Sequence, residues 1–245
     1  MLKRVQHDKK KNVIPNLFRN LEFGNDNELI AFALVVFLWK DSMKKSLFLS
    51  VLATTGLLSA TAALSQDWTS LKETFRNIRS VKADFVQKRY LKILTKPLLS
   101  EGKLFFYIPD SLRWEYLDPL QSVMLQKGST VRIYNFFEGE WKPEMPESVE
   151  ATRMVLAEIS QWFQGRFDES KAFKQLYSPG PPARVTMVPG EGVNRFIQRI
   201  EIVLSARPGV IDRVEIEEPG GSRTSIEFRN VEINSSFPAE VFEKP

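Results

Sequence analysis

The sequence has no cysteine, and its only histidine is His7, in a chain of 245 residues. Without cysteine there is no disulfide, cysteine-ligated zinc, iron–sulfur cluster, thiol nucleophile or lipidated N-terminal cysteine. His7 lies in a segment that we do not expect in the working protein, so imidazole catalysis is excluded as well. Most hydrolase mechanisms are therefore excluded.

Long apolar runs are also missing near the N-terminus, where a membrane anchor would be expected. The run Leu29–Trp39 has 11 residues, well short of the ~20 that a membrane-spanning helix requires. Residues 43–65 instead have the order of a secretory signal peptide, with two lysines after the first methionine, an apolar stretch over 47–58 and then small residues. The sequence thus predicts an exported protein.

The export signal begins at an internal methionine, Met43, and cleavage is expected after Ala62 or Ser65. We therefore interpret residues 1–42 as an extension upstream of the true start. The alternative is an unusually long signal or an uncleaved anchor. The mature chain begins near residue 66, and with no break in composition we expect residues 66–245 to form a single domain.

Charge is unevenly divided between the leader and the mature chain. The whole sequence has a net charge of +4, with 34 basic and 30 acidic residues. Residues 1–65 hold nine of the basic and five of the acidic residues, so 25 of each remain and the mature chain is neutral. We therefore expect no nucleic-acid partner and no general attraction to an anionic membrane.

Two segments have the apolar spacing of amphipathic helices. Over residues 67–82, apolar side chains recur every three or four positions, and we expect this helix to end near Ser80. Over residues 147–164 there is no glycine or proline, and Gly165 stops the run. The lid-like face of this second helix is predicted to present Val155, Ile159 and Trp162.

Short runs rich in aromatic and β-branched residues, divided by turn residues, predict antiparallel strands. The runs are 85–90, 102–108, 112–116, 122–126, 130–135, 196–204, 211–217 and 224–233. With eight to eleven strands and two helices, the predicted fold is α+β and mostly β. We expect a half-open, curved antiparallel sheet, an incomplete barrel covered by helices on one side.

Most of these strands alternate apolar and polar residues, so each has one apolar face. We expect these faces to line one concave surface, with Leu104, Phe106, Ile108, Leu112, Trp114, Tyr116, Val123, Leu125, Ile133, Ile202, Ile226 and Phe228 as its main residues. This surface is either an ordinary sealed core or a cavity that takes acyl chains. Periodicity does not distinguish the two.

Other chemistry is poorly supported by the residues. We find no glycine-rich phosphate loop, no serine in a nucleophile elbow and no dense carboxylate cluster, so neither a metal nor a cofactor is predicted. The acidic group at 215–218 is expected to be a solvated strand face. Arg113 and Glu115 are expected to form an exposed ion pair of small energetic value.

A series of short motifs, none specific alone, recurs in one order across about 150 residues. It includes Ala83-Asp84-Phe85-Val86-Gln87, Gly102 opening a strand, Pro109 with Trp114 five residues on, Pro119-x-x-Ser122-Val123-x-Leu125, Gly128, Tyr134-Asn135, Trp162, Gly165-x-Phe167, and Thr224-x-Ile226-x-Phe228-x-Asn230-x-x-x-Asn234. In order and spacing the chain resembles the LolA-type periplasmic carriers, which move lipoproteins from the inner to the outer membrane of Gram-negative bacteria.

The resemblance implies a half-open β-barrel of the LolA/LolB type, acylated lipoprotein or lipid as cargo, and no catalysis. It also implies two protein partners, an inner-membrane exporter and an outer-membrane receptor, and a freely diffusing, monomeric carrier. The family's receptor is anchored by a lipidated cysteine, so this chain is not of the receptor type.

The chain departs from the family at two positions. In the family an arginine that holds the lid directly precedes the strand proline, whereas Ile108 occupies that position here. Leu112 likewise occupies a position where the family has an aromatic residue. The segment 94–102 resembles a divergent branch whose cargo is another lipid or a glycolipid. Further alternatives are a lipid-sensing regulatory domain, or an enzyme with an acid pair among Asp84, Glu101 and Glu115.

Overall fold

The computed structural model describes residues 68–144 and 146–245. The predicted upstream extension, signal peptide and cleavage positions therefore lie outside the described residues. Among the described helices, none is both long and apolar enough to span a membrane.

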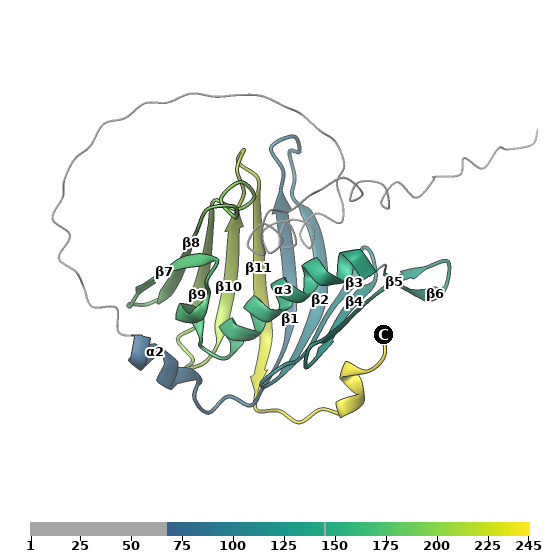
Figure 1. Ribbon diagram of the computed structural model, residues 1–245, viewed down its shortest axis with the longest axis horizontal. Helices are drawn as coiled ribbons and strands as arrows, with labels where there is room; N and C mark the ends of the chain where they lie inside the picture. Colours follow the sequence, from purple (N-terminus) through teal and green to yellow (C-terminus); the bar gives the residue numbers. More distant parts are fainter. Residues whose placement is uncertain (1–67, 145) are drawn as a thin grey trace, which may run out of the picture.

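The described chain forms one curved antiparallel sheet of eleven strands, in the order β6-β5-β4-β3-β2-β1-β11-β10-β9-β8-β7 (Figure 1). The first and last strands meet in the middle of this order, because β1 pairs with both β2 and β11. The strands are β1 (Ser80–Tyr90), β2 (Leu98–Tyr107), β3 (Ser111–Asp118), β4 (Ser122–Lys127), β5 (Thr130–Phe137), β6 (Glu140–Pro143), β7 (Phe173–Ser178), β8 (Arg184–Pro189), β9 (Arg199–Leu204), β10 (Ile211–Glu217) and β11 (Arg223–Ile233).

In residues 68–144 and 146–245, two α-helices and two short 3₁₀ helices accompany the sheet. Helix α2 (Trp68–Phe75) precedes β1, and α3 (Pro146–Phe163) crosses one face of the sheet diagonally (Figure 1). The 3₁₀ helices are η2 (Phe167–Glu169), just after α3, and η3 (Ala239–Phe242), near the C-terminus. The predicted fold class, a mostly β, open curved antiparallel sheet with helices over it, is confirmed.

The first helix is shorter than predicted, since α2 ends at Phe75 and β1 begins at Ser80. Ile78 is buried as its helical spacing suggested, but it lies in the turn between the two elements. The chain leaves the helix because distant partners bind it. The side chain of Asn234 accepts a hydrogen bond from the Arg79 N–H at 2.7 Å, and Ser80 pairs with Tyr107 in β2.

Three strands, β6, β7 and β8, were not predicted from the sequence. The last two complete the edge of the sheet beyond β9, which itself begins at Arg199 and not at Phe196. Residues 190–197 instead form turns, with the backbone N–H of Ile197 donating to the carbonyl of Val193 at 3.0 Å. The strand total is therefore the upper limit of the expected range.

The C-terminal segment, residues 234–245, packs on the sheet face opposite α3. Arg113 in β3 donates to the carbonyl oxygens of Val241 at 3.1 Å and Lys244 at 2.6 Å. The Phe237 ring meets the rings of Phe105 and Tyr107 on β2 at centroid distances of 5.6 and 6.3 Å. We call this face convex and the face under α3 concave. Both faces of the sheet centre are thus covered.

Candidate functional site

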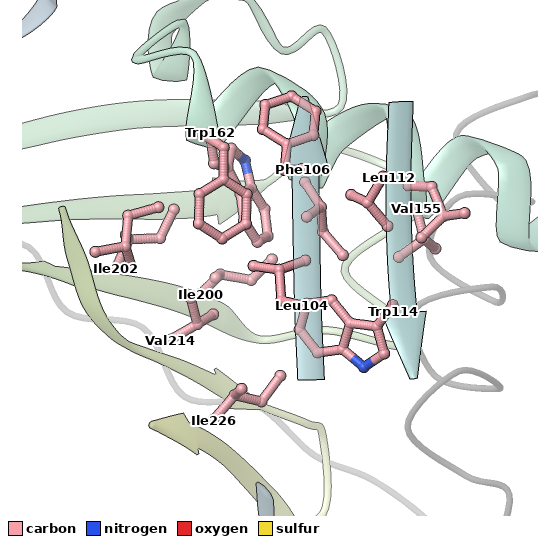
Figure 2. Packing of buried hydrophobic residues seen from close by; sticks show 14 of the residues in the cluster. Leu104, Phe106, Leu112, Trp114, Val155, Trp162, Ile200, Ile202, Val214 and Ile226 are labelled. Carbon is pink, nitrogen blue, oxygen red and sulfur yellow. The ribbon is translucent and has the colours of Figure 1, made fainter. Parts of the chain in front are cut away.

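The predicted lining residues of β2 and β3 lie side by side on the concave face. The strand register pairs Leu104 with Trp114 and Phe106 with Leu112, and directly opposed residues of an antiparallel pair point to the same face. All four are buried, with at most 1% of their surface exposed. Figure 2 shows them together with side chains from α3 and the far strands.

Strands β9, β10 and β11 extend the same face on the other side of β1. Val214 pairs with both Ile202 and Ile226, and all three are buried. Phe228 joins them opposite Phe85 of β1. The concave face is therefore continuous from β2 and β3 through β1 to β9.

Two predicted lining residues lie on the wrong face. Val123 pairs with Glu115 and Leu125 with Arg113, so both point to the convex side, where the C-terminal segment buries them. The concave residue of β4 is Met124, which pairs with Trp114 and with Ile133. The prediction was wrong because β4 is buried on both faces: its apolar pair, Val123 and Leu125, meets the C-terminal segment, while the concave positions are Ser122, Met124 and Gln126.

Ile108 lies at the margin of the concave face, one residue beyond β2. It is partly buried against the core, and its N–H donates to the carbonyl of Arg79 at 3.0 Å. The next residue, Pro109, accepts a hydrogen bond from the side chain of Gln164 at 2.9 Å. This contact joins the segment just after α3 to the turn between β2 and β3.

Helix α3 lies against the concave face through its apolar side. Val155, Ile159 and Trp162, the residues predicted for a lid, are all buried in the common core cluster. Sequence reasoning did not assign Phe163 to the lid, although its ring lies 5.8 Å from that of Phe106 and 5.7 Å from that of Phe228. Its helical spacing from Ile159 was the available signal. Aromatic contacts thus join α3 to both halves of the sheet.

The middle of the concave face is an aromatic group that sequence reasoning covered only in part. The Phe85 ring lies 4.7 Å from the Trp114 ring and 5.3 Å from the Tyr116 ring. Gly102, opposite Phe85 on β2, makes this packing possible, because a Cβ there would lie 2.4 Å from Phe85 and 2.0 Å from the Glu115 carbonyl oxygen. Alternation along β1 would have identified Phe85.

One end of the concave face is polar. The Tyr116 hydroxyl donates to Oε1 of Gln87 at 3.0 Å, and Arg89 forms an ion pair with Glu218 at 3.1 Å. Glu218 was expected to be solvated, but it is buried, and burial raises the pKa of its carboxyl while Arg89 lowers it. The partner is 129 residues away in the sequence, so local pattern gave no sign of this pairing.

The remaining polar candidates pair with neighbouring groups. The Arg113–Glu115 ion pair exists at 2.9 Å, but its side chains are only 11% and 17% exposed, because the C-terminal segment covers them. Asp84 accepts a hydrogen bond from Asn230 at 2.8 Å. Among the described residues, no group of three or more acidic, histidine or cysteine side chains is placed to hold a metal ion. The concave face offers apolar burial and little other chemistry.

Comparison with known proteins finds similarity over most of the described chain. The family model for "Outer membrane lipoprotein carrier protein LolA" matches residues 76–244. An outer-membrane lipoprotein carrier protein of Dechloromonas aromatica (strain RCB) is 25% identical over 204 residues, which is 82% of this chain and 91% of that protein. One of Pseudoalteromonas translucida (strain TAC 125) is 20% identical over 199 residues, or 79% of this chain and 90% of that protein.

Among solved structures, a LolA superfamily protein from Nitrosomonas europaea aligns with a TM-score of 0.38 at 9% identity. The alignment covers 72% of this chain and 97% of that one.

Proposed function

Because the chain belongs to the LolA family of outer membrane lipoprotein carrier proteins, we propose that it is a periplasmic carrier that binds the acyl chains of lipoproteins. It takes them into the concave face and shuttles them from the inner to the outer membrane. The observation that carries the proposal is a continuous apolar concave face covered by one amphipathic helix.

The concave face has the chemistry that acyl chains need. Burying acyl chain releases about 0.8 kcal/mol per CH₂ group, and the lining residues Leu104, Phe106 and Leu112 present only carbon to such a chain. These side chains have no exposed surface in the structure. Cargo therefore enters when α3 moves away from the sheet and replaces the contacts that α3 made.

Movement of α3 is energetically reasonable because packing holds it more than polar bonds do. Acyl chains would replace the contacts of Ile159 and Trp162 with contacts of similar apolar character. The closed and loaded states then differ little in free energy, as a carrier that must both accept and release cargo requires. Gly165, at φ +72°, ends the helix and gives the chain a bend next to it.

The proposal includes the surroundings of the protein. The carrier works as a monomer in the periplasm, receives cargo from an inner-membrane exporter and delivers it to an outer-membrane receptor. It uses no cofactor, catalyses no reaction and binds no nucleic acid.

A second cargo class is favoured by one observation, the apolar Ile108 at the margin of the site. Without a charged side chain there, the margin gives no ionic preference for the peptide part of a lipoprotein. A lipid or glycolipid would be bound by the same face.

Native mass spectrometry of the protein isolated from the periplasm, followed by lipid extraction, tests both classes. Co-purified acylated peptide supports the lipoprotein carrier, and glycolipid or free fatty acyl species support the second class. A clean mass without ligand, together with no uptake of a fluorescent fatty acid, contradicts both, and the concave face is then a sealed core.

A further inference from the structure

The hairpin formed by β1 and β2 protrudes from one edge of the sheet, meaning here the rim where strands end and turns join them. β2 pairs with β3 only from Glu101 onward, while its residues Leu98, Leu99 and Ser100 pair with β1 alone on that side. Figure 1 shows this hairpin extending above β3 and β4. We call residues 91–99, which comprise the turn and the start of β2, the hairpin tip.

The hairpin tip has an unusual composition for an exposed turn. Its nine residues, Leu-Lys-Ile-Leu-Thr-Lys-Pro-Leu-Leu, include five leucine or isoleucine side chains and two lysines but no acidic residue. Ile93 is 76% exposed, Leu99 54% and Leu94 43%. Exposed single hydrophobic residues are common on proteins, but several gathered at a protruding point indicate an interaction site.

A second turn on the same edge adds to the hairpin tip. β3 and β4 are joined beyond Asp118, which pairs with Glu101 of β2, so their turn lies at the same end of the sheet. Leu117 near the end of β3 is 40% exposed, and Leu120 in the turn is 56% exposed. At the opposite edge, the turns 108–110, 128–129 and 205–210 hold no exposed leucine, isoleucine or valine. The exposed aliphatic side chains thus favour one edge.

We propose that this edge, led by the hairpin tip, docks on the surface of an anionic phospholipid bilayer. The hairpin tip is a protrusion and not a groove, so it fits a soft layer better than a folded partner that must match its shape. Leucine and isoleucine side chains insert among lipid headgroups, while the exposed Lys92 and Lys96 on either side of Ile93 and Leu94 meet the anionic phosphates.

The neutral charge of the mature chain does not oppose this contact. Surface charge acts over about 8–10 Å at physiological salt, so a bilayer responds to the two lysines of the hairpin tip and not to the whole domain. Arg89 and Glu218, at the polar end of the concave face, lie next to this edge, at the end of β1 and just beyond β10. Docking would therefore bring that end of the concave face to the lipid.

Vesicle flotation tests the proposal with the exported form of the protein, its N-terminus established by mass spectrometry. Vesicles contain phosphatidylcholine with one third phosphatidylglycerol, or phosphatidylcholine alone. The test variants are Ile93→Asp with Leu94→Asp, and Lys92→Gln with Lys96→Gln. The control variant is Val188→Asp on β8, where the side chain is 39% exposed. Uptake of a fluorescent fatty acid is measured on each protein.

We expect the protein to bind the anionic vesicles, and the binding to weaken as the salt concentration rises. The aspartate pair reduces it at least about tenfold, and the glutamine pair about fivefold for each lysine. The Val188→Asp control binds like the original protein, and fatty-acid uptake is unchanged in all variants. Equal binding by the aspartate pair and the control, or no vesicle binding by the original protein, overturns the proposal. Failure of the carrier function is seen separately, as loss of fatty-acid uptake in every protein including the original.

Discussion

The contact between Gln164 and Pro109 provides a sensitive test of whether α3 is a lid. Nε2 of Gln164 donates to the carbonyl oxygens of Pro109 and Ser160, both at 2.9 Å. The first bond joins the segment after α3 to the turn between β2 and β3, and the second joins Gln164 to the last turn of α3. Substitution Gln164→Ala removes both bonds at a half-buried position and leaves the apolar packing of α3 intact.

The size of the effect follows from the bond that joins the two elements. A neutral hydrogen bond contributes about 0.5–1.5 kcal/mol net, and we take about 1 kcal/mol because this one is partly solvated. If α3 must leave the sheet before acyl chains enter, destabilising the closed state by that amount raises the open fraction about fivefold. The apparent affinity for an acyl probe then increases by the same factor, since it scales with the population of the binding-competent state.

Titration with a fluorescent fatty acid measures this affinity, and hydrogen exchange at α3 measures opening directly. Gln198→Ala is the matched control, because Gln198 is exposed and lies in the turn before β9, far along the chain from α3. We expect Gln164→Ala to bind about fivefold more tightly than the control and to exchange faster along α3. If both variants bind the probe equally while α3 of Gln164→Ala exchanges faster, opening of α3 does not limit binding and the lid argument is refuted.

Three further substitutions test other parts of the argument. Gly102→Ala places a Cβ 2.0 Å from a backbone oxygen of β3 and should lower the free energy of unfolding, measured in urea, by about 3 kcal/mol. The control is Gly190→Ala, whose Cβ would meet only a backbone oxygen at 3.5 Å, and it should change the free energy of unfolding by less than about 0.5 kcal/mol. Burial raises the pKa of the Glu158 carboxyl, so the stability that its protonated form contributes is lost as pH rises through that pKa. Glu158→Gln should therefore be more stable than the original protein at pH 7.5, with the gain shrinking towards pH 4. A gain that stays constant with pH would contradict the raised pKa of Glu158. Arg113→Ala removes two hydrogen bonds to the C-terminal segment and should expose residues 234–245 to limited proteolysis with a loss of about 2 kcal/mol. Unchanged cleavage would show that the remaining contacts, such as the Phe237 packing and the Arg132 bond to the Phe242 carbonyl, hold the segment without Arg113.

Some features followed from local sequence because a local rule controlled them. Leu104 and Phe106 are two residues apart on β2, so period-two spacing predicted their shared face. Val155, Ile159 and Trp162 have helical spacing on a segment without glycine or proline, and α3 forms there. In each case the neighbouring residues in the chain were sufficient to predict the element and the face that its side chains share.

Other features depended on partners far away in the sequence. Val123 and Leu125 point to the convex face, where a segment more than a hundred residues later covers them, so β4 is buried on both sides. Glu218 is buried because Arg89 reaches it from β1. Local sequence patterns predict neither the face of Val123 and Leu125 nor the burial of Glu218.

The sequence by itself determined the strands with clear alternation, the second helix, the apolar composition of one sheet face and the absence of thiol chemistry. Each of these depends on residue type or on spacing within about ten residues. The tertiary structure decided which residue of β4 faces α3, where the first helix ends, and which turns share the edge with Ile93 and Leu120. These depend on strand register and on burial by distant segments, because a side chain's surroundings are fixed only when the sheet is assembled.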